Sequence, residues 1–199
     1  TACSNFPSEN LTVNLTELVD ATRPAAAIRR IGPWQVREGR GGGKRVSAAT
    51  AASDWTDDEV QLAEQAQSAL GQSSLFMVRG GEDRLDSVLK LHGYCVVDPV
   101  QVWSAPVELL AGELPFLGAF DHWPPLAVMS EIWAEDGIGP ARIAVMERVA
   151  GPKTAILGRV SDRPAGAGFV AVHQNTAMVH ALTVLKAHRR KGCAINMLT

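Results

Sequence analysis

The chain has 199 residues, 46% of them hydrophobic, which is enough for one sizeable core or for two small cores that share an interface. Its 19 Lys and Arg residues against 21 Asp and Glu residues give a net charge of −2, which excludes a globally basic protein. The sequence shows neither a long apolar run nor a signal-peptide pattern, and its three scattered cysteines indicate reduced thiols. We therefore expect a cytoplasmic protein without nucleic-acid or membrane partners.

The first half of the chain alternates between strand and helix patterns. We expect residues 1–22 to form an arm with one helical turn, followed by a hairpin of two strands at 28–37 and 46–51. Thr56 and Glu59 form a capping-box pattern that marks the start of a helix. The further elements predicted for this half are a helix over 56–70, a strand over 74–78, a helix over 82–92 and a strand over 94–103. This alternation is typical of an α/β protein.

A change of composition separates the two halves. Residues 104–125 contain four prolines among large apolar side chains, which favours a packed crossover over a flexible Gly/Ser-rich linker. The elements predicted beyond it are helices over 126–134 and from Pro140, strands over 154–160, 166–173 and 176–185, and a helix from near Arg190.

The last predicted strand runs into a basic turn that opens the final helix. The turn reads Arg189-Arg190-Lys191-Gly192-Cys193-Ala194. The first N–H groups of a helix have no partner within it, the helix dipole adds partial positive charge, and Gly192 lets a ligand approach the backbone. The turn is therefore a candidate site for a phosphate or pyrophosphate group.

This turn resembles motif A of the GNAT superfamily of acyl-CoA-dependent N-acyltransferases, which is Gln/Arg-x-x-Gly-x-Gly/Ala between a strand and a helix. The apolar strand end at 181–184 and the spelling of 188–192 are also similar to that family. The resemblance implies a mixed α/β (α+β) fold, with a mostly antiparallel sheet flanked by helices. It also implies direct transfer of an acetyl group from acetyl-CoA to an amine in a ternary complex.

The resemblance further implies roles for particular residues. The backbone amides that would hold the CoA pyrophosphate are those of Arg189, Arg190, Lys191, Gly192, Cys193 and Ala194, and the residues that would pair with the pantetheine arm are Leu182, Thr183 and Val184. His180 lies two residues before Leu182, is expected on the same face of the strand, and is the candidate general base. The alternatives are that His180 is a structural histidine, or that Glu131 or Glu135 is the base. No metal site is expected, because the histidines show no metal-ligand spacing.

The first half resembles the degenerate GNAT-like half of two-half bacterial GNAT proteins. The residues that carry this resemblance are 31–37, 41–46, 85–86, 91–94 and 97–99. The expected division is an arm at 1–22, a degenerate half at 23–105, a crossover at 106–125 and the start of an acetyl-CoA-binding domain at 126–199. Relative to the family, the last strands of the catalytic half and a thiolate-protonating tyrosine are missing. We therefore expect an exposed sheet edge through which a homodimer could pair.

Several interpretations stay open on sequence alone. The loop at 39–45 is not a P-loop, and we expect a mobile hairpin tip, with contact to substrate or to the CoA 3′-phosphate as the alternative. Trp103, Trp123 and Trp133 are expected to cluster as core between the halves, with a ligand cage as the alternative. The acceptor is expected to be a small-molecule or peptide amine. The alternative functions are a non-catalytic or degenerate CoA-binding or interaction module, and a plain α/β domain whose turn binds any phosphate.

Overall fold

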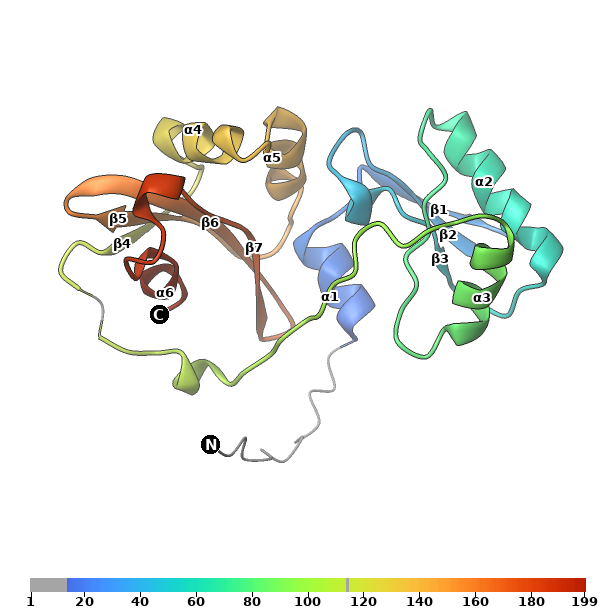
Figure 1. Ribbon diagram of the computed structural model, residues 1–199, viewed down its shortest axis with the longest axis horizontal. Coiled ribbons are helices and arrows are strands. Elements are labelled where there is room, and N and C mark those ends of the chain that lie inside the picture. The colour runs from blue at the N-terminus through green and yellow to red at the C-terminus, as the bar shows by residue number, and fades with distance from the viewer. Residues whose placement is uncertain (1–13, 114) are drawn as a thin grey trace.

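The computed structural model describes residues 14–113 and 115–199, which form two α/β halves (Figure 1). The halves meet through the N-terminal helix α1 (Leu15–Thr22) and α5 (Pro140–Glu147), and a long connection also joins them. α1 has two turns rather than the expected one, and Asn14 caps it by accepting a hydrogen bond from the Thr16 N–H at 3.1 Å. The part of the predicted arm at residues 1–13 lies outside the described residues.

The first half contains a three-stranded antiparallel sheet of order β1-β2-β3. β1 (Ala27–Ile31) and β2 (Trp34–Glu38) form a tight hairpin, and β3 is short (Thr50–Ala51). Helices α2 (Val60–Ala69) and α3 (Asp83–Leu91) pack their apolar residues against one face of this sheet. The fully buried Trp34 is the centre of this core, and its ring meets that of Phe76 edge to face at 5.3 Å.

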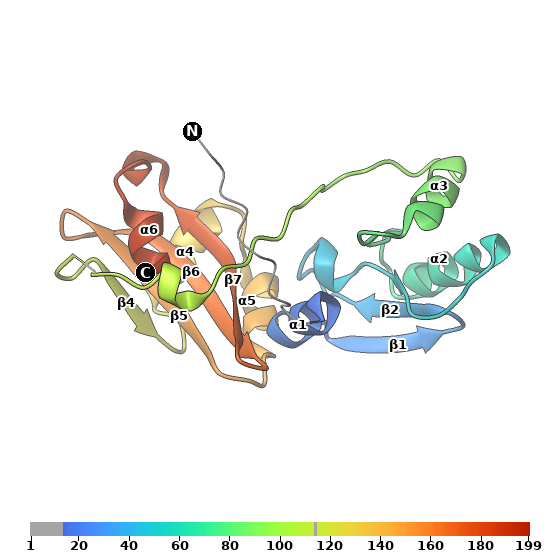
Figure 2. The same cartoon turned by 90° about the horizontal axis from the view of Figure 1, so that it is seen from below.

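The predicted strand over 28–37 is itself the β1–β2 hairpin, and of the predicted strand over 46–51 only β3 forms. Two further strands predicted in the first half also differ from the structure. Residues 74–78 form only an isolated parallel bridge, between Ala49 and Phe76. The strand predicted over 94–103 does not form, and this prediction was wrong. The segment runs extended along the outside of the molecule, where no strand of the described residues pairs with it (Figure 2). Its β-branched residues favour an extended backbone, but a ladder also requires a neighbouring strand.

The described residues of the predicted crossover up to residue 117 are exposed rather than packed, whereas residues 119–123 at its end join the second half. Phe116, for example, is 93% exposed. Trp103 is 87% exposed, so the prediction that the three tryptophans cluster is wrong. Trp133 is fully buried in the core of the second half, and the ring of Trp123 packs at 5.6 Å on that of Phe169. The three tryptophans are separated because two of them belong to one core and the third lies on the connection.

The second half contains a four-stranded antiparallel sheet of order β4-β5-β6-β7. The strands are β4 (Ala119–His122), β5 (Lys153–Val160), β6 (Arg163–His173) and β7 (Thr176–Val184). β4 was not predicted, whereas the three following strands confirm the sequence pattern. Two-residue turns with positive φ join these three strands, at Ser161–Asp162 and Gln174–Asn175.

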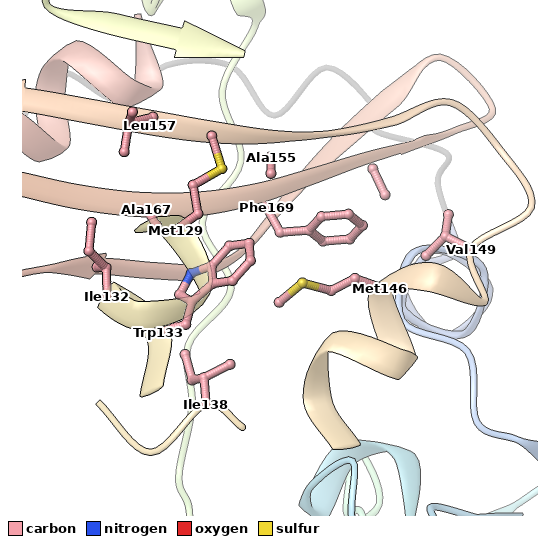
Figure 3. Close-up of a cluster of buried hydrophobic side chains, with 11 residues drawn as sticks. Met129, Ile132, Trp133, Ile138, Met146, Val149, Ala155, Leu157, Ala167 and Phe169 are labelled. Atoms are coloured by element: carbon pink, nitrogen blue, oxygen red, sulfur yellow. The ribbon is translucent and has the colours of Figure 1, made fainter. Parts of the chain in front are cut away.

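Helices cover both faces of this second sheet. On one face, α4 (Ala127–Glu135) and α5 pack the buried side chains of Met129, Trp133 and Met146 around Phe169 (Figure 3). On the other face lies α6 (Cys193–Leu198), whose Cys193 Sγ would be 2.7 Å from a Cβ atom at Gly158. A glycine at that position therefore lets α6 lie close to the sheet.

The glycine-rich loop lies in the junction of the two halves. A Cβ atom at Gly42 would be 2.4 Å from Val145 Cγ2 on α5, and one at Gly41 would be 3.3 Å from the Cβ of Ala141. The loop therefore packs on α5, which corrects the expectation of a mobile tip. The reason is that residues without side chains allow the backbone to approach the helix this closely.

Candidate active site

A β-bulge in β7 determines where the candidate side chains point. The register of β6 and β7 shifts between Ala167 and Phe169, so Ala181 and Leu182 together oppose Gly168. Ala181 has a φ of 51°, and its carbonyl accepts a hydrogen bond from the Trp133 indole at 2.9 Å. The bulge is therefore fixed to α4 by a buried side chain.

The bulge separates residues that the sequence places on one face. A Cβ atom at Gly168 would lie 3.2 Å from Leu182 Cδ1, whereas the His180 ring stacks on Phe169, with ring centroids 6.3 Å apart. His180 therefore faces α4 and α5, and Leu182 faces the opposite side. The prediction that they share a face is wrong, because the extra residue of the bulge inverts the alternation. Thr183 returns to the side of His180 and donates a hydrogen bond to Asp136 Oδ2 at 3.3 Å.

The turn after β7 presents backbone N–H groups at the start of α6. Gly192 caps α6 with a φ of 81°, and Arg190 has a φ of 61°. Among the hydrogen bonds within 14–113 and 115–199, none uses the N–H groups of residues 190–194. Apart from its two neighbours in the chain, no residue has an atom within 4 Å of a Cβ position at Gly192, so a ligand can approach there. The structure thus brings these predicted residues together in one open turn.

The three basic side chains of the turn have different roles. Arg189 Nε donates to the Val184 carbonyl and Lys191 Nζ donates to the Ala187 carbonyl, both at 3.0 Å. These two side chains therefore hold the turn against the end of β7. Arg190 is exposed and makes no side-chain hydrogen bond with the described residues, so it is the one best placed to reach a ligand.

His180 is held in one orientation by α1. Its Nε2 lies 3.0 Å from Thr22 Oγ1, and the Thr22 hydroxyl donates to the Leu18 carbonyl at 2.7 Å. The hydroxyl oxygen must then accept from Nε2–H, so the hydrogen-bond network assigns the proton to Nε2 and a lone pair to Nδ1. Nδ1 is buried and has no partner among the described residues. Burial, followed by the charges of Arg23 and Arg45, lowers the pKa of His180 to about 4, so the ring is neutral at pH 7.

A small cavity of about 150 Å³ adjoins His180 and the bulge. Its walls include Phe169, His180 and Ala181 of the sheet, and Arg23, Arg45 and Arg142 from three other segments. Glu131 and Glu135, the alternative bases, are exposed on α4 and do not line it. The loop at 39–45, which contains Arg45, was a candidate for ligand contact from the sequence. Arg23, Arg142 and Thr22 were not predicted, because no local pattern links segments so distant in the chain.

Within the described ranges, no group of three or more His, Cys, Asp and Glu side chains could hold a metal ion. No helix in this part of the chain is long and apolar enough to cross a membrane. The candidate site consists of three parts: the end of β7, the basic turn after it, and the cavity at the bulge.

The bulged antiparallel sheet, with a helix pair on one face and a turn–helix on the other, defines a GNAT-like α+β fold. A GCN5-related N-acetyltransferase from Kribbella flavida is similar in structure with a TM-score of 0.56, over 96% of this chain and 79% of that one, at 18% identity. A functionally unknown conserved protein from Staphylococcus epidermidis ATCC 12228 is similar with a TM-score of 0.53, over 92% of this chain and 82% of that one, at 8% identity. No protein-family model and no curated protein matches the sequence. At these identities the similarity shows the fold, and the division into a degenerate and a catalytic half stays a prediction.

Proposed function

We propose that the protein is an N-acetyltransferase that moves the acetyl group of acetyl-CoA directly to an amine. One observation carries this proposal: the same strand, β7, has the cavity with a neutral histidine at its bulge and the turn with free N–H groups after its C-terminal end. A cofactor on the turn would bring its acyl end to the strand, and an acceptor in the cavity would approach the same strand from beside His180. The GNAT-like fold supports a transferase.

The turn offers suitable contacts for CoA. The pyrophosphate would bind the N–H groups of residues 190–194 and the guanidinium of Arg190. The pantetheine arm would run along β7, which is an edge strand of the described sheet, past Leu182 and Val184. The Val184 carbonyl already accepts a hydrogen bond from Arg189, so a pantetheine amide at this position would displace that side chain.

The chemistry requires a neutral amine close to the thioester. The nitrogen attacks the carbonyl carbon, and the tetrahedral intermediate then expels the CoA thiolate. The nitrogen loses a proton, and the thiolate gains one to leave as the CoA thiol. In this proposal, Nδ1 of His180 accepts a hydrogen bond from the amine. With a pKa of about 4, His180 would orient the nitrogen rather than retain its proton.

A non-catalytic CoA-binding module is the second candidate. Tyr94, the one tyrosine of the chain, lies in the first half, where its hydroxyl donates to Glu64 at 2.6 Å. Burial and this bond raise the pKa of Tyr94 to about 12. It is therefore unsuited to protonate a thiolate at the end of β7.

A calorimetric titration with acetyl-CoA tests the cofactor site. We expect saturable binding that exceeds the binding of pyrophosphate, and a loss of about tenfold or more in Arg190→Glu, because a cation is replaced by an anion beside the phosphates. Arg29→Glu is the matched control, because it makes the same charge reversal at an exposed arginine on β1; this variant should bind acetyl-CoA like the parent. If the folded parent gives no heat of binding with acetyl-CoA, the proposal is overturned. Binding without release of CoA thiol across a panel of amines would favour the non-catalytic module.

A further inference from the structure

Three arginines from different segments converge on the cavity beside His180. Arg23 follows α1, Arg45 lies in a short 3-10 helix, and Arg142 lies on α5. A Cβ atom at Gly43 would lie 3.3 Å from both Nε and Nη2 of Arg142, and 3.4 Å from Nη2 of Arg23. Two guanidinium groups thus approach the same point of the glycine-rich loop.

No ion pair within the described part of the chain compensates the positive charge of these arginines. The ion pairs there involve other cations, and none joins a carboxylate to Arg23, Arg45 or Arg142. Burial, and then the charges of Arg142 and Arg45, lower the pKa of Arg23 to about 10, while Asp98 acts weakly in the opposite direction. Bringing like charges together in a partly buried site costs free energy, which a bound anion would offset.

A second polar group points to the same ligand. His180 is 7% exposed, lines the cavity, and has an unpartnered Nδ1 that accepts but does not donate in the neutral ring. The cavity therefore presents cations for an oxyanion beside an acceptor for an N–H group. Its volume of about 150 Å³ is room for a few heavy atoms only.

We infer that this cavity binds the oxyanion of the acceptor, a carboxylate or phosphate carried close to the amine that is acetylated. The guanidinium forks of the arginines bind the oxyanion, and Nδ1 of His180 binds the amine. The role of the amine rests on the proposed acetyl transfer, whereas binding of the anion does not. The substrate class is thus a small anionic amine, rather than a neutral or polycationic one.

Anion binding would also change His180. Arg23 and Arg45 are the charged groups that lower its pKa, and the other partners of the ring, Thr22 and Phe169, are uncharged. An anion beside the arginines screens them, so the pKa of His180 should rise from about 4 toward its ordinary value of 6.5.

The test uses acetate and inorganic phosphate as probes in a low-chloride buffer, with acetamide as the neutral control. Calorimetry measures affinity, and NMR of the imidazole measures the pKa of His180. We expect saturable binding of at least one anion and none of acetamide, together with a rise in the pKa of His180. The tighter of the two anions identifies carboxylate or phosphate as the group recognised.

Arg142→Gln and Arg45→Gln should each weaken anion binding by about tenfold or more, because each removes a charged hydrogen-bond donor. Arg40→Gln is the matched control, since Arg40 lies on the same loop with its side chain 68% exposed. A thermal melt of each variant verifies folding. Absence of anion binding in the folded parent, or unchanged binding in both cavity variants, would overturn the inference. If acetyl-CoA binds the same sample and the anions do not, the inference alone fails. If the anions bind and acetyl-CoA does not, the proposed function fails together with the role of the amine, whereas the anion site stands.

Discussion

At the scale of single residues, the hydroxyl of Thr22 and the charges of Arg23 and Arg45 determine the state of His180. The hydroxyl fixes the tautomer, and burial beside two guanidinium groups disfavours the imidazolium. A residue of this kind supplies a lone pair at neutral pH with little competition from protonation. His180 is therefore better suited to contact a neutral nitrogen than to exchange protons near pH 7.

The lowered pKa of His180 makes a prediction for stability. This histidine is protonated near pH 6.5 in the unfolded chain and near pH 4 in the folded chain. Its contribution to the free energy of unfolding is therefore fully present above about pH 6.5 and is lost as the pH falls toward 4. A difference of this size corresponds to about 3 kcal/mol at most. Urea unfolding of the parent and of His180→Gln at several pH values measures this difference. The free energy of unfolding of the parent should fall more steeply between pH 6.5 and 4, and parallel curves would contradict the assigned environment.

At the scale of elements, the contact between the glycine-rich loop and α5 holds the two halves together. A methyl group at Gly42 would meet Val145 Cγ2 at 2.4 Å, which is too close for any ordinary contact. The loop also carries Arg45, so its position on α5 brings that guanidinium to the cavity. Packing of this element and construction of the candidate site are therefore coupled.

We expect Gly42→Ala to lower the free energy of unfolding by about 1 to 3 kcal/mol, because the loop or α5 must move to admit the methyl group. Gly80→Ala is the matched control: neither glycine has a positive φ, and a Cβ atom at Gly80 has no neighbour within 4 Å. Chemical denaturation of both variants measures the difference. Equal stabilities would show that the loop does not pack on α5 as described.

At the scale of the whole molecule, a buried ion pair joins α1 to the sheet of the first half. Arg37 is 1% exposed, and its Nη2 lies 2.8 Å from Oδ2 of Asp20, while α1 packs on β6 and β7 of the second half. Asp20→Asn would leave the buried guanidinium without its counter-ion. We expect a loss of about 3 kcal/mol in the free energy of unfolding.

The control for this variant is Asp162→Asn, which breaks the pair with Arg159 at a side chain that is 87% exposed. It should cost less than about 1 kcal/mol, since water screens such pairs. Thermal or urea unfolding compares the two variants. If Asp20→Asn were no more destabilising than Asp162→Asn, the ion pair would not be part of the junction.

Much of the second half was predictable because its signals are local. The helix predicted over 126–134 corresponds to α4, Pro140 marked the first turn of α5, and short turns separate β5, β6 and β7. The basic turn was also recognisable, since its residues are contiguous and lead directly into α6. Elements with local patterns of this kind form as predicted, because they depend on neighbouring residues within one turn or one hairpin.

The rest depends on contacts between distant residues. The bulge lies at Ala181, which is neither Gly nor Pro and gives no sign of an irregular strand. Arg23, Arg45 and Arg142 meet only when α1, the glycine-rich loop and α5 have packed together. Residues 94–103 have the composition of a strand but lack a partner among the described residues. These features follow from tertiary arrangement, which one sequence does not encode locally.

The wall of the cavity is divided between the halves, with Arg23 and Arg45 preceding the connection and Arg142 and His180 following it. A ligand bound there would contact both halves, so its binding free energy would stabilise the state in which the halves are packed together. The relation is reciprocal: if the halves separate for part of the time, the apparent affinity falls by the fraction of molecules that are closed. A substitution far from the cavity that only loosens the junction would then weaken ligand binding without touching the ligand.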